Sequence, residues 1–520
     1  MKKALCIAII LLLAGPVAFT AAGLWVNAQK NDVAVTATTV YGDSEEAAGV
    51  QVRITSQWEG HLIWDTAYTV GSGVAESSFR FSSMGETWRS PGADTVDINF
   101  YMNWSTAITN GPNGVKFDPD SYPLSRVLRS VMERTAPGEK RTETVRLKDF
   151  YDYYPLNVLF NNRTPNVYYS EDYLDVYYSE DYSEDISFTE FLRIPIGETV
   201  LEITMEKNQD GEVADIKCSS LNEPLFANCA AFGRSGCYLT YYVDDWKNGK
   251  VGEPGENYGI YYFPYVEKKE NRSDLTIDPN QARLIYGLKP GIYTVEMGLN
   301  EAQGELYLVT KEEQEFYLSV FDTQGDDLSL KQKLMLRSVA GEFGEEGNPY
   351  WAQLSVQDSG VLMIWRDGSF VFAARQGEEF INWGLEYHPS ARETNPTTQD
   401  PEAEIQGEMA HREGDASVSY DNLTFPVENV WAFDGQRLAI ASFVDWRSLS
   451  VDLTVYTEEG LAWYGVCEHS GDIFKQQSSS LLRLVPPATF KEPSDIIIDR
   501  MHRNGVNVNE LLGIVWVNQK

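Results

Sequence analysis

Short segments in which apolar and polar residues alternate follow one another along most of this chain. The first of them cover residues 33–41, 50–55 and 61–70. A period of two residues is that of a strand with one buried face. Residues that favour tight turns lie between such segments, for example at 289–291, 366–368 and 434–436. The pattern therefore predicts short antiparallel strands joined by tight turns.

Strand-like segments between residues 191 and 487 recur in clusters. We assign four groups, which run from FLRIPI to CYLTYYVDD, from RLIYGL to FYLSVFDT, from WAQLSVQ to SFVFAARQ, and from RLAIASFVD to GLAWYGVCEH. Repeated small antiparallel sheets are typical of propeller blades. The sequence thus predicts an all-β fold of β-propeller-like repeats behind an N-terminal transmembrane or signal helix. The chain has no WD or kelch signature, so tandem β-sandwiches are the alternative.

The same pattern divides the chain into regions. We predict a signal anchor or signal peptide at 1–28, an N-terminal β-rich region at 32–150, an acidic, tyrosine-rich loop region at 151–188, a propeller-like β domain at 189–490 and a C-terminal closing segment at 491–520. A polar, proline-containing stretch at 387–415 reads as a surface insertion in the β domain. The closing segment is expected to supply a final helix and strand.

Two segments depart from the strand pattern. Residues 122–134 carry apolar side chains at the spacing of one buried helix face, namely Leu124, Val127, Leu128 and Val131. The string VYYSEDY occurs at 167–173 and again at 176–182. We interpret this tandem duplication as an exposed loop, and an aromatic and acidic interaction surface is the alternative.

The N-terminus predicts export. Lys2 and Lys3 precede an uncharged, mainly apolar stretch at 4–26. At about 1.5 Å per residue, a helix of this length crosses a hydrocarbon core of about 30 Å. The paired lysines favour a cytoplasmic N-terminus, which leaves the bulk of the chain outside. A cleaved signal peptide is the alternative, with a suitable cleavage site after Ala28.

The amino-acid composition excludes one class of binding partner and favours β-strands over helices. The chain has 42 Lys and Arg against 77 Asp and Glu, a net charge of −35. Such a surface repels phosphates, so we exclude nucleic-acid binding and expect solubility or, as the alternative, cation or basic-partner binding. Aromatic residues make up 12% of the chain, and aromatic side chains fit a pleated sheet surface.

Cysteine usage indicates structural thiols. Beyond the leader the chain has Cys218, Cys229, Cys237 and Cys467, and the first three come close together on strand-like segments. A disulfide among them is one expectation in an oxidising compartment, and its pairing stays open. A CxxC pair is absent and histidines are few, so we predict no metal site.

No catalytic motif emerges from the sequence. The motifs HExxH, GxSxG, GxxxxGK[ST] and GxGxxG are all missing. The string at 85–88 is similar to the tail of the Asp-box of sialidase-type propellers, but Ser83 stands where the Asp should be. Trp58, Trp64, Trp88 and Trp104 are frequent enough to suggest sugar stacking, and His61 and Asp65 lie on one predicted strand face. We favour a core position for Trp64 and a structural role for His61 over a catalytic one. We therefore assign no catalytic residue and no cofactor.

The leader with the segment TATTVYGDSEEAAGVQVRITSQWEGHLIWDTAY resembles uncharacterised, membrane-anchored extracytoplasmic proteins of Gram-positive Firmicutes. The resemblance implies a surface protein and brings no catalytic residues. Together these observations favour a non-enzymatic binding or sensory protein of the cell envelope, with a protein or glycan ligand at the cell surface. A glycan-active hydrolase or lyase on the same fold is the alternative, and a purely structural envelope protein is the third hypothesis.

Overall fold

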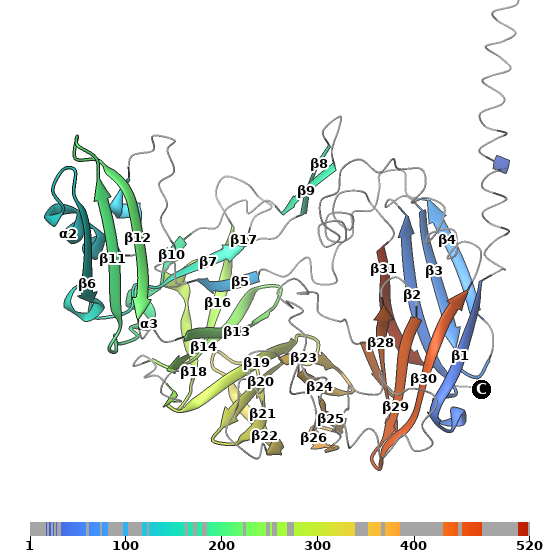
Figure 1. Cartoon of the computed structure of the whole chain (residues 1–520). Coiled ribbons are helices and arrows are strands. Elements are labelled where there is room, and N and C mark those ends of the chain that lie inside the picture. Colours follow the sequence, from blue (N-terminus) through green and yellow to red (C-terminus); the bar gives the residue numbers. More distant parts are fainter. Residues whose placement is uncertain are drawn as a thin grey trace, which may run out of the picture. The chain divides into compact units, whose positions relative to one another are not determined.

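The computed structural model describes much of the chain as two compact units (Figure 1). Unit 1 combines Met1–Ser90, Asn166–Tyr177 and Ser390–Lys520, and unit 2 combines Pro91–Pro165 and Tyr178–Pro389. Apart from five isolated positions near the N-terminus (17, 20, 21, 24 and 28), the described residues are 33–58, 62–72, 75–81, 97–101, 117–121, 124–161, 165–169, 174–178, 185–221, 225–245, 250–251, 257–267, 275–338, 352–365, 370–384, 430–445, 450–470 and 508–517.

Unit 1 is built on two antiparallel sheets that draw on both ends of the chain. The first has the order β1-β30-β29-β28-β27 and the second the order β31-β2-β3-β4. Their strands are β1 (Ala34–Gly42), β2 (Val50–Trp58), β3 (Leu62–Thr69), β4 (Ala75–Phe81), β27 (Val430–Phe433), β28 (Leu438–Asp445), β29 (Ser450–Thr457), β30 (Gly460–Ser470) and β31 (Val508–Trp516). The short 3-10 helix η2 (Ser44–Ala47) connects β1 to β2.

The chain ends are joined by backbone pairing within unit 1. Strand β1 pairs with β30, so that Ala34 lies opposite Ser470, and β31 pairs with β2, so that Val50 lies opposite Trp516. The two sheets share one core, which includes Val52, Leu453 and Ile514. Because each sheet contains strands from both ends, neither end can complete a sheet without the other.

Arg437 adds polar contacts between the N-terminal and C-terminal segments of unit 1. It follows the turn after β27, where Asp434 accepts its Nε at 3.0 Å. Its guanidinium lies 4.1 Å from the Trp516 ring centroid, and its Nη1 donates to the Glu46 carbonyl at 2.7 Å. The Trp516 indole in turn donates to the Ala432 carbonyl at 3.1 Å. One arginine therefore holds the segment η2, the β27–β28 turn and the C-terminal strand together.

Unit 2 contains a series of small antiparallel sheets. Their orders are β13-β14-β16-β17 with β15 and β18 beside it, β19-β20-β21-β22, β23-β24-β25-β26, β10-β7-β5 and β12-β11-β6. The strands of the first three are β13 (Leu225–Phe232), β14 (Gly236–Asp245), β15 (Lys250–Val251), β16 (Gly259–Glu267), β17 (Leu275–Ile277), β18 (Arg283–Gly287), β19 (Ile292–Asn300), β20 (Glu305–Glu312), β21 (Glu315–Asp322), β22 (Ser329–Ser338), β23 (Ala352–Gln357), β24 (Gly360–Trp365), β25 (Phe370–Gln376) and β26 (Glu379–Asn382).

The remaining elements of unit 2 form its more irregular part. They are β5 (Asp97–Tyr101), β6 (Lys140–Arg146), β7 (Asn157–Asn161), β10 (Asp185–Ser187), β11 (Val200–Lys207), β12 (Val213–Leu221), the helices α2 (Ser125–Arg134) and α3 (Thr189–Leu192), and the 3-10 helices η3 (Pro119–Ser121), η4 (Leu147–Asp149) and η5 (Pro279–Gln281). The predicted helix is confirmed as α2. Its Val127, Leu128 and Val131 are buried in a core shared with Leu201 and Ile203 of β11.

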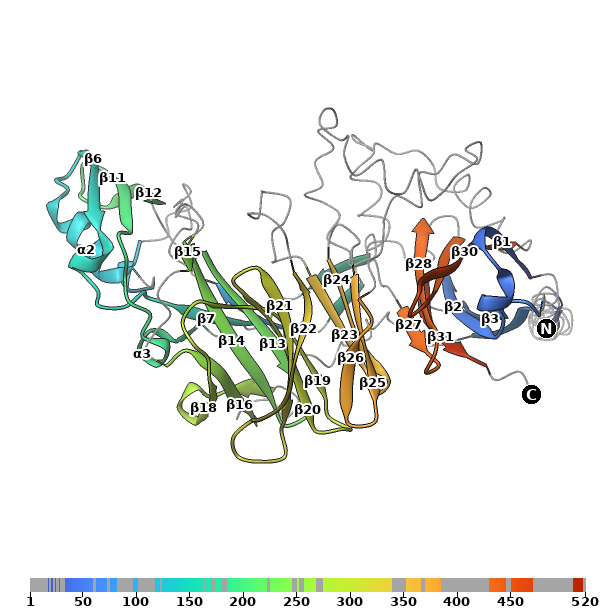
Figure 2. The same ribbon diagram turned by 90° about the horizontal axis from the view of Figure 1, so that it is seen from below.

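The sheet β19–β22 is covered on both faces, as a propeller blade is. One face contributes Leu306 and Phe321 to a core that includes Ile260 of the sheet β13–β18. The other contributes Val309 and Leu318 to a core shared with the sheet β23–β26. A two-layer sandwich leaves one face of each sheet uncovered, whereas successive sheets packed face to face are propeller-like. Figure 2 shows these three sheets following one another. The fold is therefore all-β, with propeller-like repeats of short antiparallel strands.

Some predicted details were wrong. The first strand group splits, because β11 pairs with β12 and β6, whereas β14 pairs with β13. The second group also splits, because RLIYGL forms β18 of the preceding sheet. The region 151–188 is not a plain loop: it contains β7 and β10, and the duplicated strings contribute β8 (Pro165–Tyr169) and β9 (Leu174–Tyr178), which pair with each other. The predicted turn at 366–368 and the insertion at 387–415 lie outside the described residues.

The outer strands of two neighbouring sheets protect each other's edges. The Gln332 amide on β22 donates to the Phe380 carbonyl at 2.8 Å and accepts the Phe380 amide N–H at 2.8 Å. Asn382 on β26 donates to the Met335 carbonyl at 3.1 Å and also to that of Leu336. The unpaired edge of a sheet can pair with a strand of another molecule. These side-chain amides connect β22 to β26 and occupy backbone groups that such a strand would otherwise bind.

We predict that Gln332→Ala lowers the free energy of unfolding by about 1–2 kcal/mol, because it leaves the N–H and C=O of Phe380 without their partner. Chemical denaturation of the purified protein measures the loss. The control is Gln353→Ala, at an exposed glutamine of β23, with an expected change within about 0.5 kcal/mol. Equal losses in the two variants would contradict the proposed edge role.

Candidate functional site

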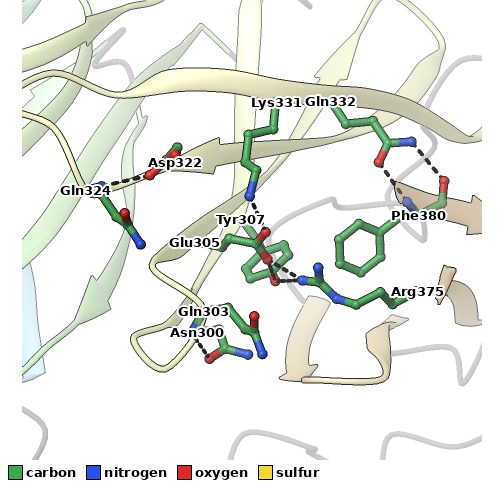
Figure 3. Close-up of polar contacts among 10 residues, drawn as sticks. All are labelled: Asn300, Gln303, Glu305, Tyr307, Asp322, Gln324, Lys331, Gln332, Arg375 and Phe380. Carbon is green, nitrogen blue, oxygen red and sulfur yellow. Dashed lines mark hydrogen bonds and ion pairs between the residues drawn. The ribbon is translucent and has the colours of Figure 1, made fainter. Parts of the chain in front are cut away.

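A buried carboxylate lies where the sheets β19–β22 and β23–β26 meet. Glu305 begins β20, and its side chain is only 3% exposed. Lys331 of β22 donates to its Oε1 at 2.7 Å, and Arg375 of β25 donates to its Oε2. Tyr307, two residues further along β20, donates to the same Oε2 at 2.6 Å. Figure 3 shows the carboxylate surrounded by these three side chains, which we call the Glu305 cluster.

Arg375 holds the cluster across the two sheets. Its Nη2 also donates to the Tyr307 hydroxyl oxygen at 2.9 Å. The guanidinium lies 4.5 Å from the Phe380 ring centroid, and the Tyr307 and Phe380 rings meet edge to face at 5.7 Å. A cation above an aromatic face and an edge-to-face ring pair are both favourable geometries. The arginine is thus packed by apolar rings and paired with a carboxylate.

The cluster keeps Glu305 ionised. Burial raises the pKa of a carboxyl group, but the hydrogen bonds from Arg375, Lys331 and Tyr307 outweigh it, and the pKa of Glu305 lies below its ordinary value of 4.5. Burial and the hydrogen bond to this carboxylate raise the pKa of Tyr307. Burial lowers the pKa of Arg375, but its pairing with Glu305 dominates and raises it. Each group therefore holds its ordinary charge at neutral pH.

The turns beside the cluster are linked in series. Asn300, at the end of β19, donates through its side-chain amide to Asp358 in the β23–β24 turn at 2.8 Å. In the other direction, Glu301 accepts the backbone N–H of Arg234, in the β13–β14 turn, at 2.6 Å. Figure 3 also shows Asn300 accepting the backbone N–H of Gln303. These bonds connect three successive sheets at one end.

The Glu305 cluster is suited to joining sheets rather than to chemistry. A general acid must hold a proton at working pH, and a nucleophile needs an adjacent base and an open approach. Glu305 is ionised, and both its oxygens accept hydrogen bonds from cations or a phenol. Asp452 of β29 is likewise buried and accepts the Tyr464 hydroxyl at 3.2 Å. Both buried carboxylates thus serve structure.

Polar side chains also lie near the contact between β13 and β19. Cys229 of β13 shares a core with Met297 of β19, Thr294 of β19 is buried, and the Tyr258 hydroxyl donates to the Ile292 carbonyl at 2.7 Å. Burial raises the pKa of Glu296 to about 7, partly opposed by the backbone N–H of Met297. No second carboxylate among the described residues contributes to this shift.

The disulfide expectation was wrong. None of Cys218, Cys229, Cys237 and Cys467 forms a disulfide; all four are buried, and they belong to three separate cores. Burial raises the pKa of Cys237 and of Cys467 to about 12 in each case, and it raises that of Cys229 as well. A thiol that stays protonated is a poor nucleophile, so these residues act as small core side chains.

The other residues singled out in the sequence do not assemble into a site that the structure describes. Asp65 lies on β3 opposite Thr55, while His61, the string at 85–88 and Trp104 fall outside the described residues. Among the described residues, no His, Cys, Asp and Glu group has metal-site geometry. Within the same part of the chain, no helix has the length and apolar character of a membrane span.

Sequence reasoning missed the Glu305 cluster, although the sequence of β20 carried a signal. In ELYLVTKE the first residue, Glu305, is followed by an apolar strand that is buried as far as Thr310. A charged residue that begins a fully buried strand needs a partner, since buried charges are paired. The partner is Arg375, which lies 70 residues further along the chain. The spacing of residues in the sequence therefore cannot identify it.

Comparisons with known proteins add no family. A scan of protein-family models gives no match, and a search of curated proteins gives none either. Among solved structures, a putative 6-phosphogluconolactonase from Bacteroides uniformis matches with TM-score 0.26 and 11% identity, over 81% of this chain and 95% of that chain. The WD40 domain of SCAP from fission yeast matches with TM-score 0.19 and 8% identity, over 79% and 74%. Scores this low carry no argument, so the architecture rests on the sheets themselves.

Proposed function

We propose that this chain is an extracytoplasmic, membrane-anchored binding or sensory protein of the bacterial cell envelope, without a catalytic role. Its ligand is a protein or glycan at the cell surface. The Glu305 cluster carries this proposal, because its buried charges are used to join neighbouring sheets. A scaffold stiffened between its repeats is what a binding surface needs, since rigidity lowers the entropy lost on binding.

The leader supports the compartment. Lys2 and Lys3 with the apolar stretch at 4–26 favour an uncleaved anchor with its bulk outside. The N-terminal peptide of the mature protein tests this part directly by mass spectrometry after membrane isolation. We expect residues 1–28 to be retained and the protein to stay in the membrane after a high-salt wash. A mature chain that begins at Gln29 would replace the anchor with a cleaved signal.

The binding role is tested by cross-linking in native membranes, followed by capture of the protein and identification of what is attached. We expect a specific surface protein or glycan whose recovery is saturable with respect to this protein. Chromogenic glycosides and peptidoglycan fragments are screened in parallel with the purified protein. Turnover that disappears in a single carboxylate variant would overturn the non-enzymatic proposal in favour of a glycan-active enzyme.

A further inference from the structure

A row of aromatic and polar side chains crosses the sheet β13–β18 close to the β13–β14 turn. Tyr238 of β14 lies opposite Tyr262 of β16, and Tyr262 lies opposite Arg283 of β18. Directly opposed residues of antiparallel strands project from the same face of the sheet. Both tyrosines pack against the core that contains Ile260, yet each side chain is only half-buried. The neighbouring sheet β19–β22 therefore covers this face only in part, and the row lies where the face stays accessible.

Contacts among its own members fix the geometry of this row. The ring centroids of Tyr238 and Tyr262 lie 5.1 Å apart with the rings tilted by 52°, and the Arg283 guanidinium lies 5.8 Å from the Tyr262 centroid. The hydroxyl oxygens of Tyr262 and Ser235 are 3.1 Å apart, which is a hydrogen-bonding distance. A side chain at position 236 would come within 2.7 Å of the Tyr262 hydroxyl oxygen, so Gly236 leaves the space that this phenol occupies. We call Tyr238, Tyr262, Arg283 and Ser235 the Tyr262 cluster.

Hydrogen bonds join the turns beside the Tyr262 cluster. Ser235 of the cluster belongs to the β13–β14 turn. Glu301, in the β19–β20 turn, accepts the backbone N–H of Arg234 from that first turn at 2.6 Å. The Gly304 carbonyl, at the end of the β19–β20 turn, accepts the N–H of Thr323 at the start of the β21–β22 turn at 2.9 Å. Three turns from two successive sheets are therefore connected to one another beside the cluster.

The charges at these turns are balanced. The Nη1 atom of Arg283 lies 3.6 Å from a carboxylate oxygen of Asp326 in the β21–β22 turn, and the Nε atom of Arg234 lies 3.5 Å from one of Glu301. All four side chains are accessible, from 42% exposed for Glu301 to 98% for Asp326. Ion pairs this exposed contribute about 0–1 kcal/mol, so a ligand can replace them at little cost in stability. Two guanidinium and two carboxylate groups thus offer hydrogen-bond donors and acceptors without net charge, although the whole chain carries −35.

We propose that the Tyr262 cluster and its two neighbouring ion pairs form a binding site for a neutral glycan. A sugar ring presents apolar C–H groups beside hydroxyl groups that both donate and accept hydrogen bonds. Tyr238 and Tyr262 supply aromatic surface for the apolar groups, and the charged side chains supply donors and acceptors for the hydroxyl groups. An anionic glycan would meet the carboxylates of Glu301 and Asp326, and an apolar ligand would leave buried charges without partners. This inference rests on the proposed binding role, for which it specifies the ligand class and the place.

Binding of the purified full chain to an array of neutral and acidic oligosaccharides tests the proposal, and titration calorimetry then measures the affinity for the strongest neutral ligand. We expect neutral oligosaccharides to bind and acidic ones to bind about tenfold more weakly. Tyr262→Ala should weaken binding about tenfold because it removes a ring from the site, whereas Tyr262→Phe keeps the ring and should weaken it only a few-fold. The matched control is Tyr317→Ala, at a half-buried tyrosine near the opposite end of β21, which should leave the affinity unchanged.

A second variant separates binding from folding. Arg283→Ala, at a side chain that is 52% exposed, should weaken glycan binding several-fold while the melting temperature stays that of the unmodified protein. Glycan binding that neither Tyr262→Ala nor Arg283→Ala weakens, or binding restricted to acidic oligosaccharides, would overturn the inference. An array without any binding would also overturn it, and the proposed binding role would still stand if cross-linking in membranes captured a surface protein. The binding role itself fails only if the array and the cross-linking both give nothing.

Discussion

Replacement of Arg375 by alanine is expected to lower the free energy of unfolding by about 3–5 kcal/mol, because it leaves the buried carboxylate of Glu305 without its main partner. Arg375 is 14% exposed and Glu305 is 3% exposed, so water cannot replace the lost guanidinium. The substitution also removes the cation from the Phe380 ring. Chemical denaturation, followed by tyrosine and tryptophan fluorescence, measures the loss.

Lys331 provides the control on the same carboxylate. It donates to the other oxygen of Glu305 at 2.7 Å, but its side chain is 39% exposed. Ion pairs with a solvated partner contribute about 0–1 kcal/mol, so Lys331→Ala should cost much less than Arg375→Ala. Similar losses in both variants would mean that burial does not determine the strength of these pairs.

The contribution of the Glu305 cluster should also depend on pH in a known direction. The pKa of Glu305 is lower in the folded chain than its ordinary value of 4.5, since its hydrogen bonds outweigh the effect of burial. A lowered pKa gives stability that is present above that value and is lost as the pH falls through the folded pKa. The difference between the unmodified protein and Arg375→Ala should therefore shrink in acid and stay constant between pH 6 and pH 8.

The second large effect is expected at the C-terminal strand. Ile514 of β31 is 5% exposed and packs into the core of unit 1 with Val52 and Leu453. Ile514→Ala should destabilise unit 1 by about 2–5 kcal/mol, through lost burial and the cavity left behind. Since β31 pairs only with β2 in its sheet, the substitution weakens the connection between the two ends of the chain. Denaturation monitored by amide hydrogen exchange of β2 measures the effect.

The next residue along the strand supplies the control. Val515 is 40% exposed, because successive side chains of a strand point to opposite faces. Val515→Ala should change the free energy of unfolding by less than about 0.5 kcal/mol. If Val515→Ala were as damaging as Ile514→Ala, the register of β31 on β2 would be wrong by one residue.

The alternation of residues was sufficient to predict many strands. The segment 50–55 is the start of β2, and 61–70 contains β3, because one buried face imposes period two on the sequence. The strand groups from WAQLSVQ and from RLAIASFVD each lie within one sheet, since their consecutive strands pair with each other. The apolar spacing at 124–131 likewise identified α2.

Pairing between distant segments could not be predicted in this way. A period of two residues fixes which face of a strand is buried, but it does not name the neighbouring strand. The sheet edges illustrate this limit: β18 continues the sheet of β16, although its sequence position suggests the group that begins with β19. The ion pair between Glu305 and Arg375 could not be predicted either, because the two residues belong to different sheets and come together only when the sheets pack.

The amino-acid sequence alone established the all-β class, many strand positions, the helix α2 and the acidic character of the chain. These properties depend on local periodicity and composition, which a single segment carries. The packing of the folded chain determined that β1 and β31 complete sheets with β30 and β2, that the four described cysteines form no disulfide, and that Glu305 is paired with Arg375. Those outcomes depend on which surfaces become buried against each other. Burial determines the free energy required to keep a charged group or a thiolate inside the protein.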